Sequence, residues 1–329
     1  MLNSKIKLAE NVMDINKIEM LPTRDGYGKG LVAAGAKDPR IVVLSADLTE
    51  STRSLWFKEK FPERFIEMGV AEQNMATVAS GMANYGKIPF ISSYAVFSPG
   101  RNYEQIRTTV ALNNVPVKIA GAHAGVSVGP DGATHQALED IAIMRAMPNM
   151  IVLVPCDTIE TEKATIAAAF NNKPTYLRFG REKSPVITTK DTPFEIGTAE
   201  IFKTGKDVVI IVCGILVYNA LLAAEELKNE GIDAMVINNH TIKPMDEKTI
   251  IAAAKETGAV VTVEEHQIAG GMGSAISEIL AKNYPVPMEF VGMKDRFGES
   301  GEPTELIEAL GMGMNSIKNA VHKVLKRKR

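Results

Sequence analysis

Short, almost wholly apolar runs recur along the chain, and each is followed by a segment whose apolar residues have helical spacing. The clearest run, residues 41–48, is rich in β-branched side chains, as is typical of parallel strands buried on both faces. In the first half, the pattern predicts strands at 41–48, 65–70, 89–94, 117–121, 151–155 and 174–178, with helices at 24–36, 71–85, 103–113, 136–146 and 159–171.

A polar stretch with two prolines, residues 180–193, interrupts this alternation and is interpreted as a linker. A second alternation follows, with strands at 208–213, 234–238, 259–264 and 288–292 and helices at 218–229, 246–257, 273–283 and 316–325. We therefore expect an α/β protein of two domains, each a mostly parallel sheet flanked by helices. The expected boundaries are residues 1–182 for the first domain, 183–194 for the linker and 195–329 for the second domain.

Composition and charge count against several classes of protein but do not identify the function. The 329 residues carry a net charge of −2, which gives no electrostatic reason to expect a nucleic acid or a membrane as partner. The N-terminal stretch has both charge signs and no apolar block, and the longest apolar run, 208–218, is too short to span a bilayer. Cys156 and Cys213 lie in apolar runs and form no CxxC motif. A cytoplasmic enzyme or enzyme subunit is the resulting expectation.

Residues 65–107 contain the first candidate site. Glu72 follows a predicted strand and opens a predicted helix, and Tyr94, Phe97 and Tyr103 come at and after the end of the next strand. A carboxylate and an aromatic ring placed in this way could hold a flat heterocycle, the carboxylate at a ring nitrogen and the aromatic over the ring face. The alternative is an acid favoured by the helix dipole beside core aromatics, and the pattern leaves both open.

The second candidate site is the glycine-rich loop 121–139, which carries His123, Asp131 and His135. Glycines allow close approach of the backbone to a ligand, and imidazoles can bond to hydroxyls or phosphate. The histidine spacing fits no standard metal site, whereas a simple glycine-rich turn remains open. Arg24 and Arg181 stand at element boundaries and suit a phosphate, although each alone could be a surface cation. The sequence AGGMGSA at 269–275 is interpreted as a tight turn with close helix packing.

Taken together and in order, four stretches resemble a known family: SADLTES, GVAEQNM, GPDGATHQ followed by MPNMIVLVPCD, and FGRE. They resemble the C-terminal half of transketolase, and the match runs from about Pro22 over nearly the whole chain. The form is most similar to split transketolases, in which two polypeptides share what is elsewhere one chain. The resemblance implies a thiamine diphosphate enzyme that transfers a two-carbon ketol unit between sugar phosphates, built from a pyrimidine-binding domain and a transketolase-type C-terminal domain.

The resemblance also implies roles for residues of the cofactor pocket. Glu72 matches the glutamate that bonds to N1′ of the aminopyrimidine and so promotes the proton transfer that activates the cofactor. Phe97 matches the aromatic stacked on the pyrimidine, Tyr94 lines the same pocket, and Asp47 matches an acid close to the cofactor. After Phe97 the chain departs from long transketolases by one residue, and Tyr103 is expected to take the role of a tyrosine that those enzymes place sooner.

Substrate contacts are implied in the same way. His123 and His135 match histidines at the reacting end and hydroxyls of the sugar, and Asp131 matches an aspartate that binds a sugar hydroxyl. The residues expected to grip the distant phosphate are Arg24, Ser51 and Arg181. Ala124 and Pro130 replace acids of long transketolases, so fine substrate preference does not carry over.

One absence shapes the expected assembly. Thiamine enzymes hold the diphosphate through Mg²⁺ or Ca²⁺ bound to a GDG motif and a later asparagine, and no GDG occurs in this sequence. We therefore expect an N-terminal partner subunit that carries this motif and the metal, in a heterotetramer of two copies of each chain. The alternatives are another thiamine enzyme subunit, similar to deoxyxylulose-phosphate synthase or to the β subunit of 2-oxo acid dehydrogenases, or a non-catalytic assembly subunit.

Overall fold

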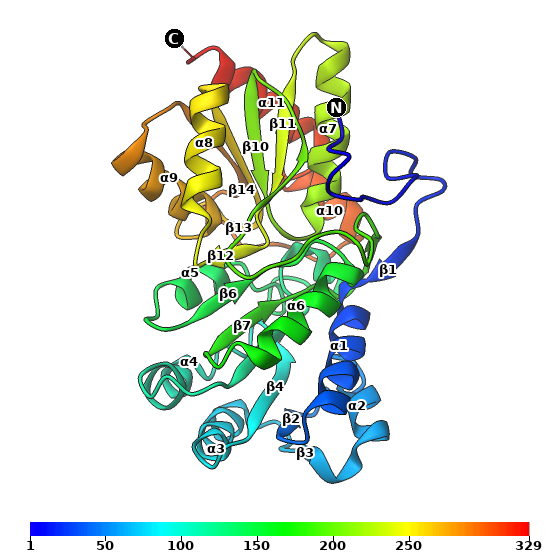
Figure 1. Ribbon diagram of the computed structural model, residues 1–329, viewed down its shortest axis with the longest axis vertical. Coiled ribbons are helices and arrows are strands. Elements are labelled where there is room, and N and C mark those ends of the chain that lie inside the picture. Colours follow the sequence, from blue (N-terminus) through cyan, green and yellow to red (C-terminus); the bar gives the residue numbers. More distant parts are fainter. Residues whose placement is uncertain (329) are drawn as a thin grey trace.

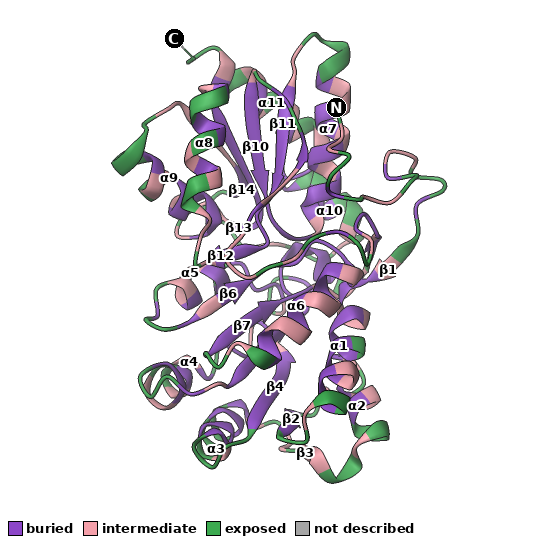
Figure 2. Cartoon of the chain, in the orientation of Figure 1, coloured by how far each residue is buried: buried purple, intermediate pink, exposed green. Residues whose placement is uncertain are grey.

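The computed structural model describes residues 1–328, which form two α/β units, one above the other (Figure 1). The lower unit contains a seven-stranded sheet and the upper unit a five-stranded sheet. The strands at the centres of both sheets are buried, and the exposed residues gather on the surrounding helices and loops (Figure 2). The expected fold class, two α/β domains with mostly parallel sheets, is confirmed.

The first sheet has the strand order β12-β6-β7-β5-β4-β2-β3 and is parallel except for β12 at its edge. Its strands are β2 (Ile41–Ser45), β3 (Phe65–Glu67), β4 (Ile88–Tyr94), β5 (Lys118–Ala122), β6 (Ile151–Leu153), β7 (Thr175–Arg178) and β12 (Thr241–Lys243). The helices around it are α1 (Thr23–Lys37), α2 (Ser54–Lys60), α3 (Glu72–Asn84), α4 (Tyr103–Gln105), which continues as the π-helix η2 (Ile106–Ala111), α5 (Asp140–Arg145) and α6 (Thr158–Phe170).

Glycines bring α1 and α6 unusually close together. A Cβ atom at Gly26 would collide with the backbone carbonyl of Thr158, and one at Gly30 would collide with the side chain of Thr165. The side chain of Asp157 caps α6 by accepting the backbone N–H of Glu160 at 2.8 Å. This close packing fixes the first turn of α1, where Arg24 lies, against the first sheet.

The second sheet has the order β14-β13-β10-β11-β9, in which only β9 is antiparallel to its neighbour. Its strands are β9 (Glu200–Lys203), β10 (Val208–Val212), β11 (Ala234–Asn238), β13 (Val260–Gln267) and β14 (Met288–Met293). The helices are α7 (Val217–Asn229), α8 (Glu247–Thr257), α9 (Met272–Asn283), α10 (Pro303–Ala309) and α11 (Met314–Leu325). Every residue of β10, whose sequence is VVIIV, is buried at the centre of the sheet.

The two halves of the chain exchange segments, which the sequence pattern did not predict. Strand β12 comes from the second half but pairs with β6 at the edge of the first sheet. Before β1 (Met20–Pro22), which pairs with β8 (Lys183–Pro185), the N-terminal segment runs beside α7 (Figure 1). Its apolar side chains Ile6, Val12 and Ile18 belong to the core of the second unit. Within residues 1–328, no helix combines the length and the apolar character that crossing a membrane requires.

Candidate active site

The order of strands in the first sheet brings distant residues to one edge. Strands β7, β5, β4, β2 and β3 are consecutive neighbours and parallel, so their carboxyl ends meet on the same side. This is the edge at which open parallel sheets bind ligands. All of the predicted site residues except Arg24 and Tyr103 lie at or just beyond these strand ends: Arg181, His123, Asp131, His135, Tyr94, Phe97, Asp47, Ser51 and Glu72.

Glu72 is the first residue of α3, and its side chain is 2% exposed. Its carboxylate accepts a hydrogen bond from Nη1 of Arg101 at 2.8 Å, and its backbone carbonyl accepts one from the Asn102 side chain at 3.1 Å. Arg101 is 47% exposed and lies over the Phe97 ring, 4.9 Å from its centroid. The buried carboxylate is therefore presented beside an aromatic face, with an exchangeable surface cation as its partner.

Two aromatic rings join the two candidate sites. The Tyr94 and Phe97 rings are stacked with centroids 6.1 Å apart, and the His123 ring lies 4.0 Å from Tyr94. The His135 ring meets the edge of Phe97 at 5.5 Å. Both histidines therefore converge on the same aromatic pair, although the sequence separates them by a glycine-rich loop.

His123 is fully buried, and its backbone lies in the left-handed region with φ of +54°. Neither ring nitrogen has a hydrogen-bond partner among the described residues. Burial lowers the pKa of this imidazole to about 3, and the nearby Arg24 and Arg181 guanidinium groups act in the same direction. A neutral imidazole with two unpaired nitrogens can both donate to and accept from a ligand hydroxyl.

Arginine side chains gather on one side of the histidines. The Thr23 hydroxyl accepts the backbone N–H of Gly180 at 2.8 Å, which joins the start of α1 to the segment that carries Arg181. Arg24 donates to the carbonyl of Ser51 at 3.0 Å, and Arg181 donates to Asp131 at 3.2 Å. These bonds bring together four of the six predicted substrate residues, Arg24, Ser51, Asp131 and Arg181.

The electrostatics of this arginine cluster favour an anion. Burial lowers the pKa of Arg24, and the neighbouring Arg53 and Arg181 cations lower it further. Nε of Arg24 is buried without a partner. Arg53, which the sequence analysis missed, is held next to α1 by its ion pair with Asp25 at 2.7 Å. Converging cations of this kind are stabilised when a phosphate or similar anion binds between them.

Asp47 lies in a turn shaped by another residue that the sequence analysis did not single out. Its backbone has a φ of +59°, and its N–H donates to the Glu67 carboxylate at 2.8 Å. The same carboxylate accepts the Thr49 hydroxyl at 2.6 Å and the N–H of Gly69 at 3.1 Å. Glu67 thus joins the turns after β2 and β3, and the Asp47 side chain is exposed at the edge of the site.

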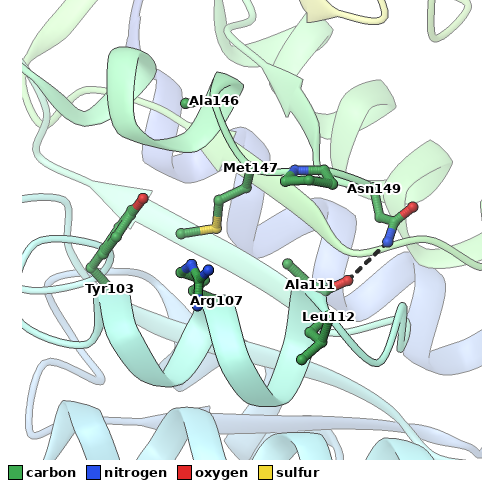
Figure 3. Close-up of a pocket in the computed structure, with 8 residues that line it drawn as sticks. Tyr103, Arg107, Ala111, Leu112, Ala146, Met147 and Asn149 are labelled. Atoms are coloured by element: carbon green, nitrogen blue, oxygen red, sulfur yellow. Dashed lines mark hydrogen bonds between the residues drawn. The ribbon is translucent and has the colours of Figure 1, made fainter.

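Tyr103 is the predicted residue that these contacts do not bring into the group. It lies in a separate cavity of about 190 Å³ between α4–η2 and the loop 146–149 (Figure 3). Arg107 and Met147 share that cavity with it, and Asn149 closes one end by donating to the carbonyl of Ala111 at 3.0 Å. Arg101, four residues after Phe97, contacts Glu72 and Phe97 instead. The sequence analysis did not predict this role of Arg101, which lies in the stretch where the chain departs from long transketolases by one residue.

Two family models together match most of the chain. Residues 19–186 match the family model described as the transketolase pyrimidine binding domain, and residues 197–317 match that of the transketolase C-terminal domain. The chain belongs to the transketolase family. A Methanocaldococcus jannaschii protein named as a transketolase C-terminal section is 43% identical over 92% of this chain and 96% of its own length.

Further comparisons show which part of transketolase the chain corresponds to. A solved structure titled "Split gene transketolase, inactive beta4 tetramer" superposes with a TM-score of 0.88 at 46% identity, and the match covers 94% of this chain and all of that one. A Clostridium protein named 6-deoxy-6-sulfo-D-fructose transketolase subunit SqwH is 41% identical over 95% of this chain and 97% of its own. Human transketolase is 36% identical, but the match covers 92% of this chain and only 49% of the human one. The chain thus corresponds to the C-terminal subunit of a split transketolase.

The transketolase family uses thiamine diphosphate and a divalent metal, and the residues present suit one part of that cofactor. The buried Glu72 carboxylate beside the Phe97 face fits an aminopyrimidine ring, which offers a nitrogen at its edge and a flat face. Within residues 1–328, no group of three or more His, Cys, Asp or Glu side chains is arranged to hold a metal ion. The part of the cofactor that Glu72 and Phe97 suit is the pyrimidine ring.

Proposed function

We propose that this chain, together with an N-terminal partner subunit, catalyses the transfer of a two-carbon ketol unit between sugar phosphates. The observation that carries the proposal is the convergence of the buried Glu72, the Tyr94–Phe97 pair and the arginine cluster on one sheet edge. In this proposal residues 1–182 form the pyrimidine-binding domain, residues 183–194 the linker and residues 195–329 the C-terminal domain, while the N-terminal segment and β12 each pack on the other domain.

On the cofactor side, Glu72 would bond to N1′ of the aminopyrimidine and hold a proton there. Phe97 would cover the ring face, with Tyr94 and Asp47 beside it, while Tyr103 would support this region from the neighbouring cavity. Thiamine diphosphate, when bound, supplies the carbanion chemistry that carries the two-carbon unit. Because Arg101 pairs with Glu72 at 2.8 Å, cofactor binding would have to displace this guanidinium group.

On the substrate side, His123 and His135 would bond to the reacting end of the sugar, and Asp131 would bond to a hydroxyl. The neutral, unpaired imidazole of His123 supports this role, because one ring nitrogen can donate a hydrogen bond to a sugar oxygen and the other can accept one from a hydroxyl. Arg24, Ser51 and Arg181 would bind the terminal phosphate. Binding energy gained there orients the reacting carbonyl, which accounts for a phosphorylated substrate.

The partner subunit would complete the cofactor site. The absence of a GDG motif from this chain, and its match to half the length of human transketolase, support a metal and diphosphate site on a separate polypeptide. The metal would be Mg²⁺ or Ca²⁺, both of which prefer oxygen ligands. A heterotetramer of two copies of each chain is the assembly that we propose.

The relative named for 6-deoxy-6-sulfo-D-fructose suggests a second donor. A sulfonate and a phosphate are both tetrahedral oxyanions, and an arginine cluster can bind either of them with charge-assisted hydrogen bonds. We propose the sugar phosphate as the main donor, and the sulfosugar is a competitor that the same assay can include.

Reconstitution tests the proposal. This chain is purified alone and with a partner carrying the GDG–Asn motif, and transfer from xylulose 5-phosphate or 6-deoxy-6-sulfo-D-fructose to an aldose phosphate is measured with thiamine diphosphate and Mg²⁺. We expect the mixture to transfer the two-carbon unit from the phosphorylated donor, and we expect no transfer by this chain alone. Transfer by this chain alone, or a mixture that binds the cofactor but transfers from neither donor, would overturn the proposal.

A further inference from the structure

The loop between β5 and α5 contains His123, Asp131 and His135 but little regular structure of its own. Its middle, residues 126–131, forms 3-10 turns around Gly129, whose φ is +78° and ψ is −117°. Backbone hydrogen bonds close its individual turns, such as Gly132 N–H to the Gly129 carbonyl at 3.1 Å, but the placement of the loop also depends on the groups packed against it. Several of those groups belong to the second domain.

The main contact comes from Glu265 in β13. Its buried carboxylate accepts the backbone N–H of Ser127 at 2.6 Å, a short charge-assisted bond across the two domains. Gly125 makes the approach possible, because a Cβ atom at this position would collide with the Glu265 carboxyl group. The φ of +87° at Gly125 also favours glycine, so conformation and contact require the same residue.

The rest of the loop is held by the segment before α10 and by the first residue of that helix. Gln136 donates to the carbonyl of Val126 at 3.1 Å and to the carbonyl of Glu299 at 3.0 Å, which joins both ends of the loop to the second domain. A Cβ atom at Gly129 would lie 2.9 Å from Cγ of Pro303, and one at Gly132 would collide with the Ser300 hydroxyl. The contacts at Gly129 and Gly132 therefore lie on either side of Asp131, and the bonds of Gln136 lie next to His135.

Glu265 is itself held in place by the first domain. Nη2 of Arg178, at the end of β7, donates to the Glu265 carbonyl at 2.8 Å, and its Nε donates to Asp140 at 2.8 Å. Burial raises the pKa of Glu265, and the positive charge of Arg178 acts in the opposite direction. The backbone of Glu265 is therefore held by the first domain, while its carboxylate is bonded to the loop.

We propose that Glu265 is a positioning residue through which the second domain sets the geometry of His123, Asp131 and His135 for the sugar. The part of this inference that concerns the sugar rests on the function proposed above. The Glu265 carboxylate bonds to the loop backbone, and within residues 1–328 no hydrogen bond joins it to these three side chains, so it acts through the loop.

The test compares Glu265→Ala with Glu265→Gln, whose amide oxygen can still accept the Ser127 N–H, and with Glu256→Ala on the exposed face of α8 as control. In the chain alone, hydrogen exchange of residues 124–134 should become about tenfold faster in Glu265→Ala and stay unchanged in the other two variants. Exchange in α3, which carries Glu72, should not change in any variant.

In the reconstituted enzyme, Glu265→Ala should lower kcat/KM for the phosphorylated donor by about tenfold, while thiamine diphosphate affinity stays within about twofold. Unchanged loop exchange, or equal losses of cofactor affinity and donor kcat/KM, would refute the positioning role. An inactive wild-type mixture would count against the proposed function alone, because loop exchange is measured without the partner. If Glu265→Ala does not fold, Gln136→Met removes the second bond between loop and domain, and the same outcomes apply.

Discussion

The buried ion pair between Arg178 and Asp140 lies within the first domain, and the same arginine donates to Glu265 of the second domain, so it offers a quantitative test of this part of the structure. Their side chains are 6% and 2% exposed, and Nε of Arg178 lies 2.8 Å from the Asp140 carboxylate. The Tyr176 hydroxyl donates to the same carboxylate oxygen at 2.6 Å. Arg178→Leu leaves this carboxylate buried with a single neutral donor, so we expect a loss of about 3–5 kcal/mol in the free energy of unfolding.

Denaturation in urea, followed by far-ultraviolet circular dichroism at neutral pH, measures this loss. The matched control is Arg296→Leu, because Arg296 is 54% exposed and pairs with Glu299 at 3.3 Å; this change should cost at most about 1 kcal/mol. The double variant Arg178→Leu with Asp140→Leu should recover at least about half of the loss, since the uncompensated charge is gone. If Arg178→Leu costs no more than the control, the assignment of Arg178 and Asp140 as a buried ion pair is wrong.

Three further predictions concern the site and the sheet. Glu72→Ala should lower kcat of the reconstituted enzyme by about 10²–10⁴-fold with the assembly intact by analytical ultracentrifugation; normal turnover would contradict its role. Arg181→Ala should raise KM for a phosphorylated donor by about 10-fold or more and leave a non-phosphorylated ketose nearly unaffected, whereas equal effects would remove it from the phosphate site. Lys118 is buried with only neutral acceptors, the Asn171 side chain and the Lys173 carbonyl, and burial lowers its pKa to about 7. Between this value and its ordinary one, near 10.5, the unfolded chain binds more protons, so stability should rise with pH by about 1.4 kcal/mol per unit relative to Lys118→Met. Urea denaturation of both proteins from pH 7.5 to 9 measures this difference. A difference in the free energy of unfolding that does not change with pH would contradict a lowered pKa of Lys118.

The fold class was predictable because most strands of both sheets are buried on both faces and therefore appear as continuous apolar runs. Strand β12 was not predictable, because Thr241–Lys243 is short and pairs antiparallel with a strand far away in the sequence. The predicted strand 41–48 ends at Ser45, since Asp47 turns into the left-handed region to meet Glu67. Local pattern cannot reveal such tertiary partners.

The candidate site was predictable to the extent that its residues lie at strand ends. Arg53, Arg101 and Glu265 were missed because their roles arise from contacts between elements rather than from a motif. The prediction for the glycine cluster at 269–275 is confirmed, and the reason lies in a neighbouring strand. The Glu264 carboxylate accepts the N–H groups of Met272 and Gly273 at 2.7 and 2.8 Å, so it occupies the place that a phosphate would take.

The claim that this chain supplies only the pyrimidine side of a shared cofactor site is tested most directly by calorimetric titration of thiamine diphosphate with Mg²⁺. The titration is made into this chain alone, into its mixture with a partner carrying the GDG–Asn motif, and into the mixture containing Glu72→Ala. We expect binding only in the mixture, and an affinity at least about tenfold lower in the variant. Comparable binding by the isolated chain, or an affinity in the mixture that Glu72→Ala leaves unchanged, would contradict the account.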